Sequence, residues 1–199
     1  MRPDQAFAFA AFALVAAGTP GPSNTLLVAT GARVGVLRGL PALLGQGAGM
    51  ALMLFVVGLG LGALVLAQPV LLGLVRWSGV VFLLWLAWRI ALSRGHVVVQ
   101  PDTRPLGFLG MVAFQWLNPK ALLIATSAAA TFADAGTDPL IHAGLMAVIF
   151  FAVALLVCSP WLVFGATIQQ VLRSERSMRA FNIAMGVLLA ASVVPLVLE

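Results

Sequence analysis

Residues 18–24 read Gly-Thr-Pro-Gly-Pro-Ser-Asn, a polar stretch in the middle of an otherwise apolar segment. No ionisable side chain occurs between Asp4 and Arg33, on either side of this stretch. An apolar segment of about 20 residues is long enough to cross a bilayer as a helix. Proline lacks the backbone donor that a continuous helix needs. The sequence therefore predicts a membrane-spanning helix over residues 5–31 that is broken near mid-depth.

A second break, Asn118-Pro119-Lys120, lies 96 to 100 residues further along the chain. Residues 121–128, which follow it, match residues 25–32 at five of eight positions. Each matching segment directly follows a proline-containing break, so the breaks correspond as well as the helices. Two homologous units of three spans have opposite orientations in a membrane, because three is odd. This pattern predicts an inverted repeat, the plan of many secondary transporters.

The amino-acid composition indicates that the whole chain lies in a membrane. Of 199 residues, 62% are hydrophobic and 9% are charged, and the mean hydropathy is +1.09. An ordinary soluble domain carries about a quarter charged residues. At roughly 20 residues a span, the length holds about six spans and no separate soluble domain. We therefore expect an all-α integral membrane protein with six transmembrane helices in two inverted three-helix repeats, in which spans 1 and 4 are broken at mid-depth.

Charged residues and turn signals divide the chain into spans. The expected spans are residues 5–31, 39–66, 70–92, a fourth between Arg104 and Asp134, 140–168 with an interruption at Ser159-Pro160, and 179–197. The only sustained polar stretch separates the third span from the fourth. The predicted organisation is a first repeat over residues 1–93, a cytoplasmic linker over 94–105 and a second repeat over 106–199.

The basic residues predict the orientation in the membrane. Eight of the eleven fall in loops on one side: Arg33, Arg38, Arg89, Arg94, Arg104, Arg173, Arg176 and Arg179. Basic loops face the cytoplasm. Both termini are therefore expected outside a bacterial inner membrane. Because the net charge of +5 consists almost wholly of arginines between apolar runs, it indicates topology and not a nucleic-acid partner.

The two breaks predict a binding site. Pro22 and Pro119 suit the first position of a helix, and Gly21 and Asn118 are placed as caps. Under the inverted topology, two electropositive helix N-termini face each other near the bilayer centre, where a carboxylate fits between them. Lys120 is the only lysine, and burying its ammonium is costly. It is interpreted as a carboxylate partner or a proton carrier, the alternative being a side chain that extends to the interface.

The candidate site residues follow from these breaks and from the polar side chains expected at depth. Asn24, Gln46 and Gln115 are interpreted either as ligands or as interhelical hydrogen-bonding groups. The predicted substrate-binding set is Thr19, Pro20, Gly21, Pro22, Asn24, Gln46, Gln115, Asn118, Pro119 and Lys120. The candidates for proton coupling are Lys120, Asp134 and His142, with Asp138 beside them near the outer mouth. No catalytic residue, metal site or cofactor is expected.

A family resemblance rests on these same motifs. Thr19-Pro20-Gly21-Pro22, the glycines at 31, 35, 39, 45 and 49, and Asn118-Pro119-Lys120 resemble the LysE/RhtB family of bacterial amino-acid exporters. The likeness covers essentially the whole chain, including its length and central linker. It implies a secondary active exporter of amino acids in the inner membrane, driven by proton entry, with an amino acid, protons and lipid as partners. A homo-oligomer is compatible with it.

The distribution of acids predicts the substrate class. The six acids lie at positions 4, 102, 134, 138, 175 and 199, near span ends or in loops. A dibasic amino acid would bring an extra cation into a low dielectric without a counter-charge. The predicted substrate is therefore a neutral or hydroxy amino acid or a homoserine-type derivative. Its α-amino group is assigned to backbone carbonyls around residues 16–19 and 114–117, and to Gln115 or Asn24.

Three alternatives remain at this point. A membrane hydrolase needs a nucleophile and base at depth, but His142 is expected near the surface and no Gly-x-Ser-x-Gly or His-Glu-x-x-His motif occurs. A metal exporter of the same superfamily would need clustered ligands, whereas the chain has one cysteine and two distant histidines. A non-transporting subunit of a membrane complex is the third. The sequence favours a transporter over an enzyme.

Overall fold

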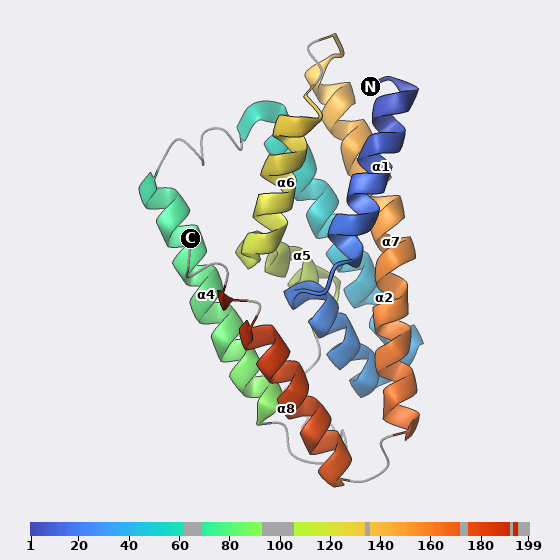
Figure 1. Ribbon diagram of the computed structural model, residues 1–199, viewed down its shortest axis with the longest axis vertical. Coiled ribbons are helices and arrows are strands. Elements are labelled where there is room, and N and C mark those ends of the chain that lie inside the picture. The colour runs from blue at the N-terminus through green and yellow to red at the C-terminus, as the bar shows by residue number, and fades with distance from the viewer. Residues whose placement is uncertain (62–68, 93–105, 134–135, 172–174, 192, 195–199) are drawn as a thin grey trace.

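The computed structural model of the protein describes residues 1–61, 69–92, 106–133, 136–171, 175–191 and 193–194. Every regular element in these ranges is a helix (Figure 1). The elements in chain order are α1 (Pro3–Gly18), α2 (Pro22–Val56), the π-helix η1 (Val57–Leu61), α4 (Pro69–Ala91), α5 (Phe108–Leu117), α6 (Pro119–Thr131), α7 (Pro139–Val171) and α8 (Glu175–Ala191). The all-helical prediction is confirmed for the described residues.

The first break divides α1 from α2 without reversing the chain. A Cβ built on Gly18, at the end of α1, would lie 3.9 Å from Val157 of α7. One built on Gly31 of α2 would lie 2.1 Å from the carbonyl oxygen of Leu162, further along α7. α1 and the beginning of α2 therefore run beside α7 in the same direction and form one interrupted pass.

The chain reverses inside α2. Gly35 has a φ of 77° and a ψ of 179°, a conformation that is open to glycine and strained for other residues. Beyond it, Gly47 approaches Phe151 and Gly58 approaches Ala143, so the chain now runs antiparallel to α7. The end of the first predicted span and the second span are thus joined in α2 by a turn at this glycine.

The second break is sharper than the first. α5 and α6 are bent by 72° at Asn118. α5 begins with its Phe108 carbonyl against Gly45 of α2, and α6 leads to Phe132, whose ring lies 5.2 Å from that of Phe9 in α1. This interrupted pass therefore ends at the side of the molecule where α1 begins, as Figure 1 shows. The two broken passes run in opposite directions.

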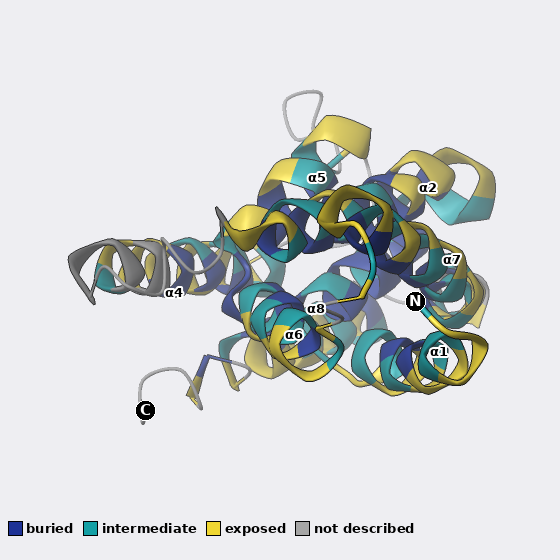
Figure 2. Ribbon diagram, turned by 90° about the horizontal axis from the view of Figure 1, so that it is seen from above, coloured by how far each residue is buried: buried dark blue, intermediate teal, exposed yellow. Residues whose placement is uncertain are grey.

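The remaining helices form a pair at one side of the bundle. α4 and α8 pack against each other, with Gly186 of α8 against the carbonyl of Ala87 in α4 (Figures 1 and 2). α4 also reaches the second break, because Gly79 lies against the carbonyl oxygen of Leu117. The core between the other helices combines large side chains such as Phe9 and Phe114 with small ones such as Ala125.

The outer faces of the helices are apolar. Trp77 and Trp88 of α4 and Val148 and Leu156 of α7 are each more than half exposed, and Figure 2 shows exposed residues on the outward sides of most helices. Among the described residues, Pro22–Gly60 and Pro139–Ile168 are long and apolar enough to cross a membrane, and the bent pair α5–α6 makes a third candidate. Such faces are typical of proteins whose solvent is lipid.

The expected interruption of the fifth span is wrong, because α7 runs unbroken through Pro160. Proline removes the N–H that would reach the carbonyl of Leu156, four residues earlier. The Ser159 hydroxyl donates to that carbonyl at 3.0 Å and replaces the missing bond. In the described part of the sixth span, the helix covers residues 175–191 instead of beginning at 179.

Close helix packing predicts different effects for two glycines of α7. Gly165→Ala would place a methyl group 2.0 Å from the carbonyl oxygen of Val28, whereas Gly144→Ala meets nothing within 4 Å. We expect the first change to lower the free energy of unfolding by about 1–3 kcal/mol and the second to leave it within about 0.5 kcal/mol. Thermal unfolding of purified protein in detergent measures both. Equal midpoints would contradict the close approach of α2 and α7.

Candidate functional site

The two helix breaks meet at Lys120. Its ammonium Nζ donates to the carbonyl oxygens of Thr19 at 2.8 Å and Pro20 at 3.4 Å. Gly21 makes this approach possible, because a Cβ there would lie 3.0 Å from both Cδ and Nζ of Lys120. The only lysine of the chain thus joins the second break to the carbonyl side of the first.

The helix N-termini at the two breaks differ in how they are capped. α6 is closed by Asn118, whose Oδ1 accepts from the Lys120 N–H at 3.2 Å, as its position in the sequence predicts. α2 begins after Gly21, which has no side chain to accept a hydrogen bond from the first turn. Both residues therefore occupy the predicted N-cap positions, but only Asn118 caps its helix through a side chain. The α2 N-terminus is the more open of the two.

Polar side chains link the breaks across the bundle. The Asn118 amide donates to Ser23 Oγ at 2.8 Å, and that hydroxyl donates to Gln115 Oε1 at 2.9 Å. Gln115 Nε2 in turn donates to the carbonyl oxygen of Gln46 at 3.1 Å. These bonds connect α6, α2 and α5 with the returning part of α2.

A second set of bonds closes this chain into a ring. Gln46 Nε2 donates to Asn24 Oδ1 at 3.0 Å and to Cys158 Sγ at 3.3 Å. Asn24 Nδ2 donates to the carbonyls of Ala17 at 2.8 Å and Thr19 at 3.0 Å. The Thr19 carbonyl also accepts from the Lys120 ammonium, which completes the ring. The bonds of Gln46 with Asn24 and Gln115 are buried and pair groups that would otherwise lie unpaired among apolar helices.

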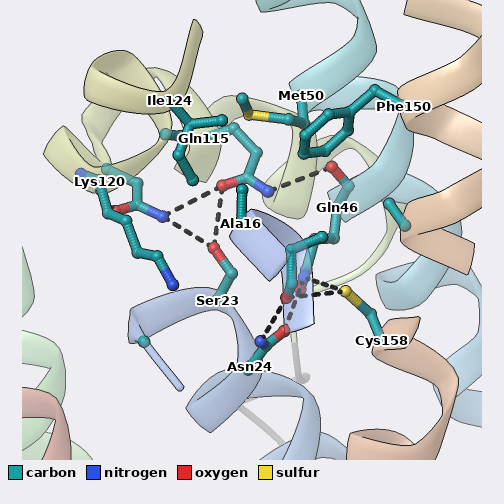
Figure 3. A pocket seen from close by; sticks show the side chains of 15 residues that line it. Ala16, Ser23, Asn24, Gln46, Met50, Gln115, Lys120, Ile124, Phe150 and Cys158 are labelled. Carbon is teal, nitrogen blue, oxygen red and sulfur yellow. Dashed lines mark hydrogen bonds between the residues drawn. The ribbon is translucent and has the colours of Figure 1, made fainter. Parts of the chain in front are cut away.

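The ring surrounds a cavity of about 40 Å³. Figure 3 shows Lys120, Ser23 and Gln115 on one side of it and Asn24, Gln46 and Cys158 on another. The full lining is Ala16, Ala17, Gly21, Ser23, Asn24, Gln46, Met50, Gln115, Asn118, Lys120, Ala121, Ile124, Phe150, Ala154 and Cys158. At about 10–15 Å³ for one water molecule, the space restricts an occupant to a small solute. Its wall combines apolar surface with a few directed polar groups, as in many ligand pockets.

The structure brings together most residues of the predicted site. Six of the ten line the cavity, namely Gly21, Asn24, Gln46, Gln115, Asn118 and Lys120. Thr19 and Pro20 contribute carbonyls to Lys120, while Pro22 and Pro119 are buried at the first helical positions behind the cavity. The carbonyls of Ala17 and Thr19, which we expected to hold a ligand amine, already accept bonds from side chains.

Ser23 and Cys158 are part of the site but were not predicted as ligands. Ser23 directly follows Pro22, the first residue of the helix after the first break. This position of a hydroxyl is the feature of the sequence that could have identified Ser23 as a site residue. Cys158 is the single cysteine and precedes Ser159-Pro160. Its side chain points inward on the same buried stripe of α7 as Phe150 and Ala154, a spacing of four residues that the sequence displays.

Of the proton-coupling candidates that the structure describes, Lys120 lines the cavity, whereas Asp138 and His142 do not. Asp134 lies outside the described residues. Asp138 caps α7, because its Oδ1 accepts from the N–H groups of Leu140 at 2.9 Å and Ile141 at 3.2 Å. His142 is 7% exposed, and neither of its ring nitrogens has a hydrogen-bond partner. Within the described part of the chain, no three His, Cys, Asp or Glu side chains are grouped to hold a metal ion.

The fold and site together define a polytopic helical membrane protein with a small polar cavity where two broken helices meet. The family model of the LysE type translocators matches residues 14–199, so the chain belongs to that family. The resemblance seen in the sequence motifs is confirmed. The family is one of translocators and not a class of enzymes.

Characterised relatives are similar over most or all of the chain. A cysteine/O-acetylserine efflux protein of Escherichia coli O1:K1 / APEC is 28% identical over 193 residues, 95% of each chain. Proteins of the same name from Klebsiella pneumoniae and Salmonella paratyphi A are 31% and 33% identical, over 66% of this chain and 67% of theirs. No solved structure matches the chain.

The hydrogen-bonded ring predicts a cost for losing one hydroxyl. Ser23→Ala removes the hydroxyl that bridges the side chains of Asn118 and Gln115. The buried amide atoms of these two residues then lose their hydrogen bonds of 2.8 Å and 2.9 Å to it. We expect the free energy of unfolding to fall by about 1–3 kcal/mol. Ser127→Ala, at an exposed position on α6, is the matched control and should change it by less than about 0.5 kcal/mol. Thermal unfolding in detergent makes the comparison; no difference between the variants would argue against the ring.

Proposed function

We propose that the protein is a secondary active exporter of small zwitterionic amino acids across the bacterial inner membrane. The observation that carries the proposal is the meeting of Lys120 with the first helix break around a polar cavity. A transporter of this kind needs a site near mid-depth that can be reached from either side, and discontinuous helices supply one. Membership of a translocator family agrees with this function.

Two groups are proposed to bind the substrate carboxylate. The uncapped N-terminus of α2 offers the positive end of a helix dipole and unpaired N–H groups after Gly21. The Lys120 ammonium lies beside the same glycine. In the structure the ammonium is held by the Thr19 and Pro20 carbonyls. A carboxylate entering the cavity would compete with them and loosen the contact between the breaks.

The substrate class is proposed from the site and from the relatives. No acidic side chain among the described residues lines the cavity, so a second cation on a dibasic substrate would have no counter-charge from them. The relatives are named for efflux of cysteine and O-acetylserine, two small amino acids with uncharged side chains. We propose the same class of substrate for this chain, including hydroxy amino acids and homoserine-type derivatives.

Alternation between the two sides is proposed to use the inverted repeat. The broken passes run in opposite directions, the returning part of α2 packs against α7, and α4 packs against α8. Each such pair joins counterparts in the two predicted repeats. The N-terminal ammonium of Met1 donates to Thr137 Oγ1 at 2.9 Å, which supports placing the N-terminus beside the arginine-free loop, on the outer side.

Proton entry is proposed as the driving force, with His142 and Lys120 as the described candidates. His142 shares a buried stripe of α7 with Met146 and Phe150, and Phe150 lines the cavity. Neither ring nitrogen of His142 forms a hydrogen bond with another described residue, so both remain available to a donor or acceptor on the transport path. Asp138 is the weaker candidate, because it already caps a helix.

Loss of the lysine should stop export without loss of protein. Lys120→Ala removes the proposed carboxylate partner. We therefore expect the initial rate of export to fall by about tenfold to a hundredfold. Abundance in the membrane should stay near normal, because removing a buried charge relieves an insertion cost. Thr126→Val, on the same helix but outside the cavity lining, is the control. Normal export by Lys120→Ala would contradict the proposed site.

Substrate class and coupling can be tested together in vesicles. Purified protein in liposomes should move labelled cysteine, O-acetylserine or serine in response to an imposed pH gradient, and lysine at least tenfold more slowly. Preferential movement of lysine would overturn the substrate class. Movement of no amino acid would favour another solute or a non-transporting subunit.

His142→Gln should retain exchange of substrate across the membrane but lose acceleration by the gradient.

A further inference from the structure

One acceptor of the ring has no partner. Gln46 is 5% exposed, and its Oε1 makes no hydrogen bond among the described residues, although Nε2 makes two. A buried amide oxygen without a partner costs free energy comparable to a lost hydrogen bond. Gln46 lines the cavity (Figure 3). An unused acceptor at that place points to a donor on an occupant.

The orientation of the Gln46 amide is fixed by its neighbours. Asn24 must direct its NH₂ group at the carbonyls of Ala17 and Thr19, because carbonyls only accept. Its Oδ1 therefore faces Gln46, which must present Nε2 to it. A flip of the Gln46 amide would place two oxygens against each other. The free atom is thus the oxygen, on a residue that lines the cavity.

The other acceptors around the cavity are already engaged. Gln115 Oε1 accepts from Ser23 and Asn118, and Asn118 Oδ1 accepts from the Lys120 N–H. Asn24 Oδ1 accepts from Gln46, so the earlier assignment of a ligand amine to Gln115 or Asn24 is not supported by their bonds. In the part of the chain that the structure describes, no acidic side chain lines the cavity. Gln46 Oε1 is the side-chain amide oxygen that remains.

We propose that Gln46 Oε1 accepts a hydrogen bond from the α-ammonium of the transported amino acid and makes the cavity specific for amines. This inference rests on the proposed function and refines it. Gln46 comes from the returning part of α2, whereas Lys120 and the open N-terminus of α2 come from the two breaks. The zwitterion is thereby held at two ends by different passes. A carboxylic acid without an amine leaves this oxygen buried and unpaired.

Three related thiols separate the two ends of the ligand. Cysteine carries both charged groups, 3-mercaptopropionate lacks the amine and cysteamine lacks the carboxylate. Under reducing conditions, binding of labelled cysteine to the purified full chain is measured in competition with the unlabelled compounds. The amine ratio is the affinity for cysteine divided by that for 3-mercaptopropionate. The carboxylate ratio is the affinity for cysteine divided by that for cysteamine.

The inference predicts opposite effects in two variants. In Gln46→Leu the amine ratio falls about tenfold to a hundredfold from that of the unsubstituted protein, while the carboxylate ratio changes little. In Lys120→Ala the carboxylate ratio falls and the amine ratio is kept. Gln46→Glu retains an oxygen acceptor but sets its second oxygen against Asn24 Oδ1, so its affinity for all three thiols should fall. Its amine ratio, which compares ligands on the same variant, should still equal or exceed that of the unsubstituted protein. Because each ratio compares ligands on one variant, a general loss of affinity does not imitate the result.

Three further outcomes distinguish this inference from the proposed function on which it rests. If the unsubstituted protein binds cysteine and Gln46→Leu keeps its amine ratio, the role of Gln46 is overturned and the exporter remains. If Gln46→Leu does not yield folded protein, a fall of the amine ratio in Gln46→Glu overturns the same role. If the unsubstituted protein binds and moves no amino acid, the proposed function fails and the inference fails with it.

Discussion

The ammonium of Lys120 on the carbonyl oxygen of Thr19 is the contact on which the rest of the site depends. A helix that breaks inside a bilayer frees backbone groups that have no water to bind, and each must find a partner in the protein. Here each break supplies what the other lacks, because carbonyls are free at the end of α1 and a cation stands at the start of α6. Two costly interruptions become tolerable only when they lie together.

The amide ring extends this principle through the bundle. Hydrogen bonds of three amide side chains connect the two breaks through the returning part of α2, namely those of Asn24, Gln46 and Gln115. Each amide constrains the direction of the next, so the arrangement leaves one defined oxygen without a partner and a helix N-terminus without a side-chain cap, both on residues that line the cavity. In the proposed mechanism a zwitterion meets both. Its release would restore the bond between Lys120 and the first break.

The sequence predicted the parts of this site that depend on backbone chemistry. Pro22, Pro119 and the lone lysine mark breaks wherever they occur in an apolar segment, and five-of-eight matching positions related the two breaks to each other. The sequence could not predict which side-chain amide oxygen lacks a hydrogen bond. That depends on the contacts of Asn24 with two backbone carbonyls, which only the folded structure shows. Pro160 misled the prediction, since the hydroxyl of the preceding serine replaces the lost bond.

The central claim is that the two breaks meet, and a cross-link tests it most directly. Cysteines at Ser23 and Gln115, whose side chains are 2.9 Å apart, are introduced into a Cys158→Ser chain in native membranes. A short bifunctional thiol reagent should join them, as detected by mass spectrometry. A pair at Ser23 and Thr167, on different passes, should react only singly. Single reaction of the first pair, without a cross-link, would contradict the account.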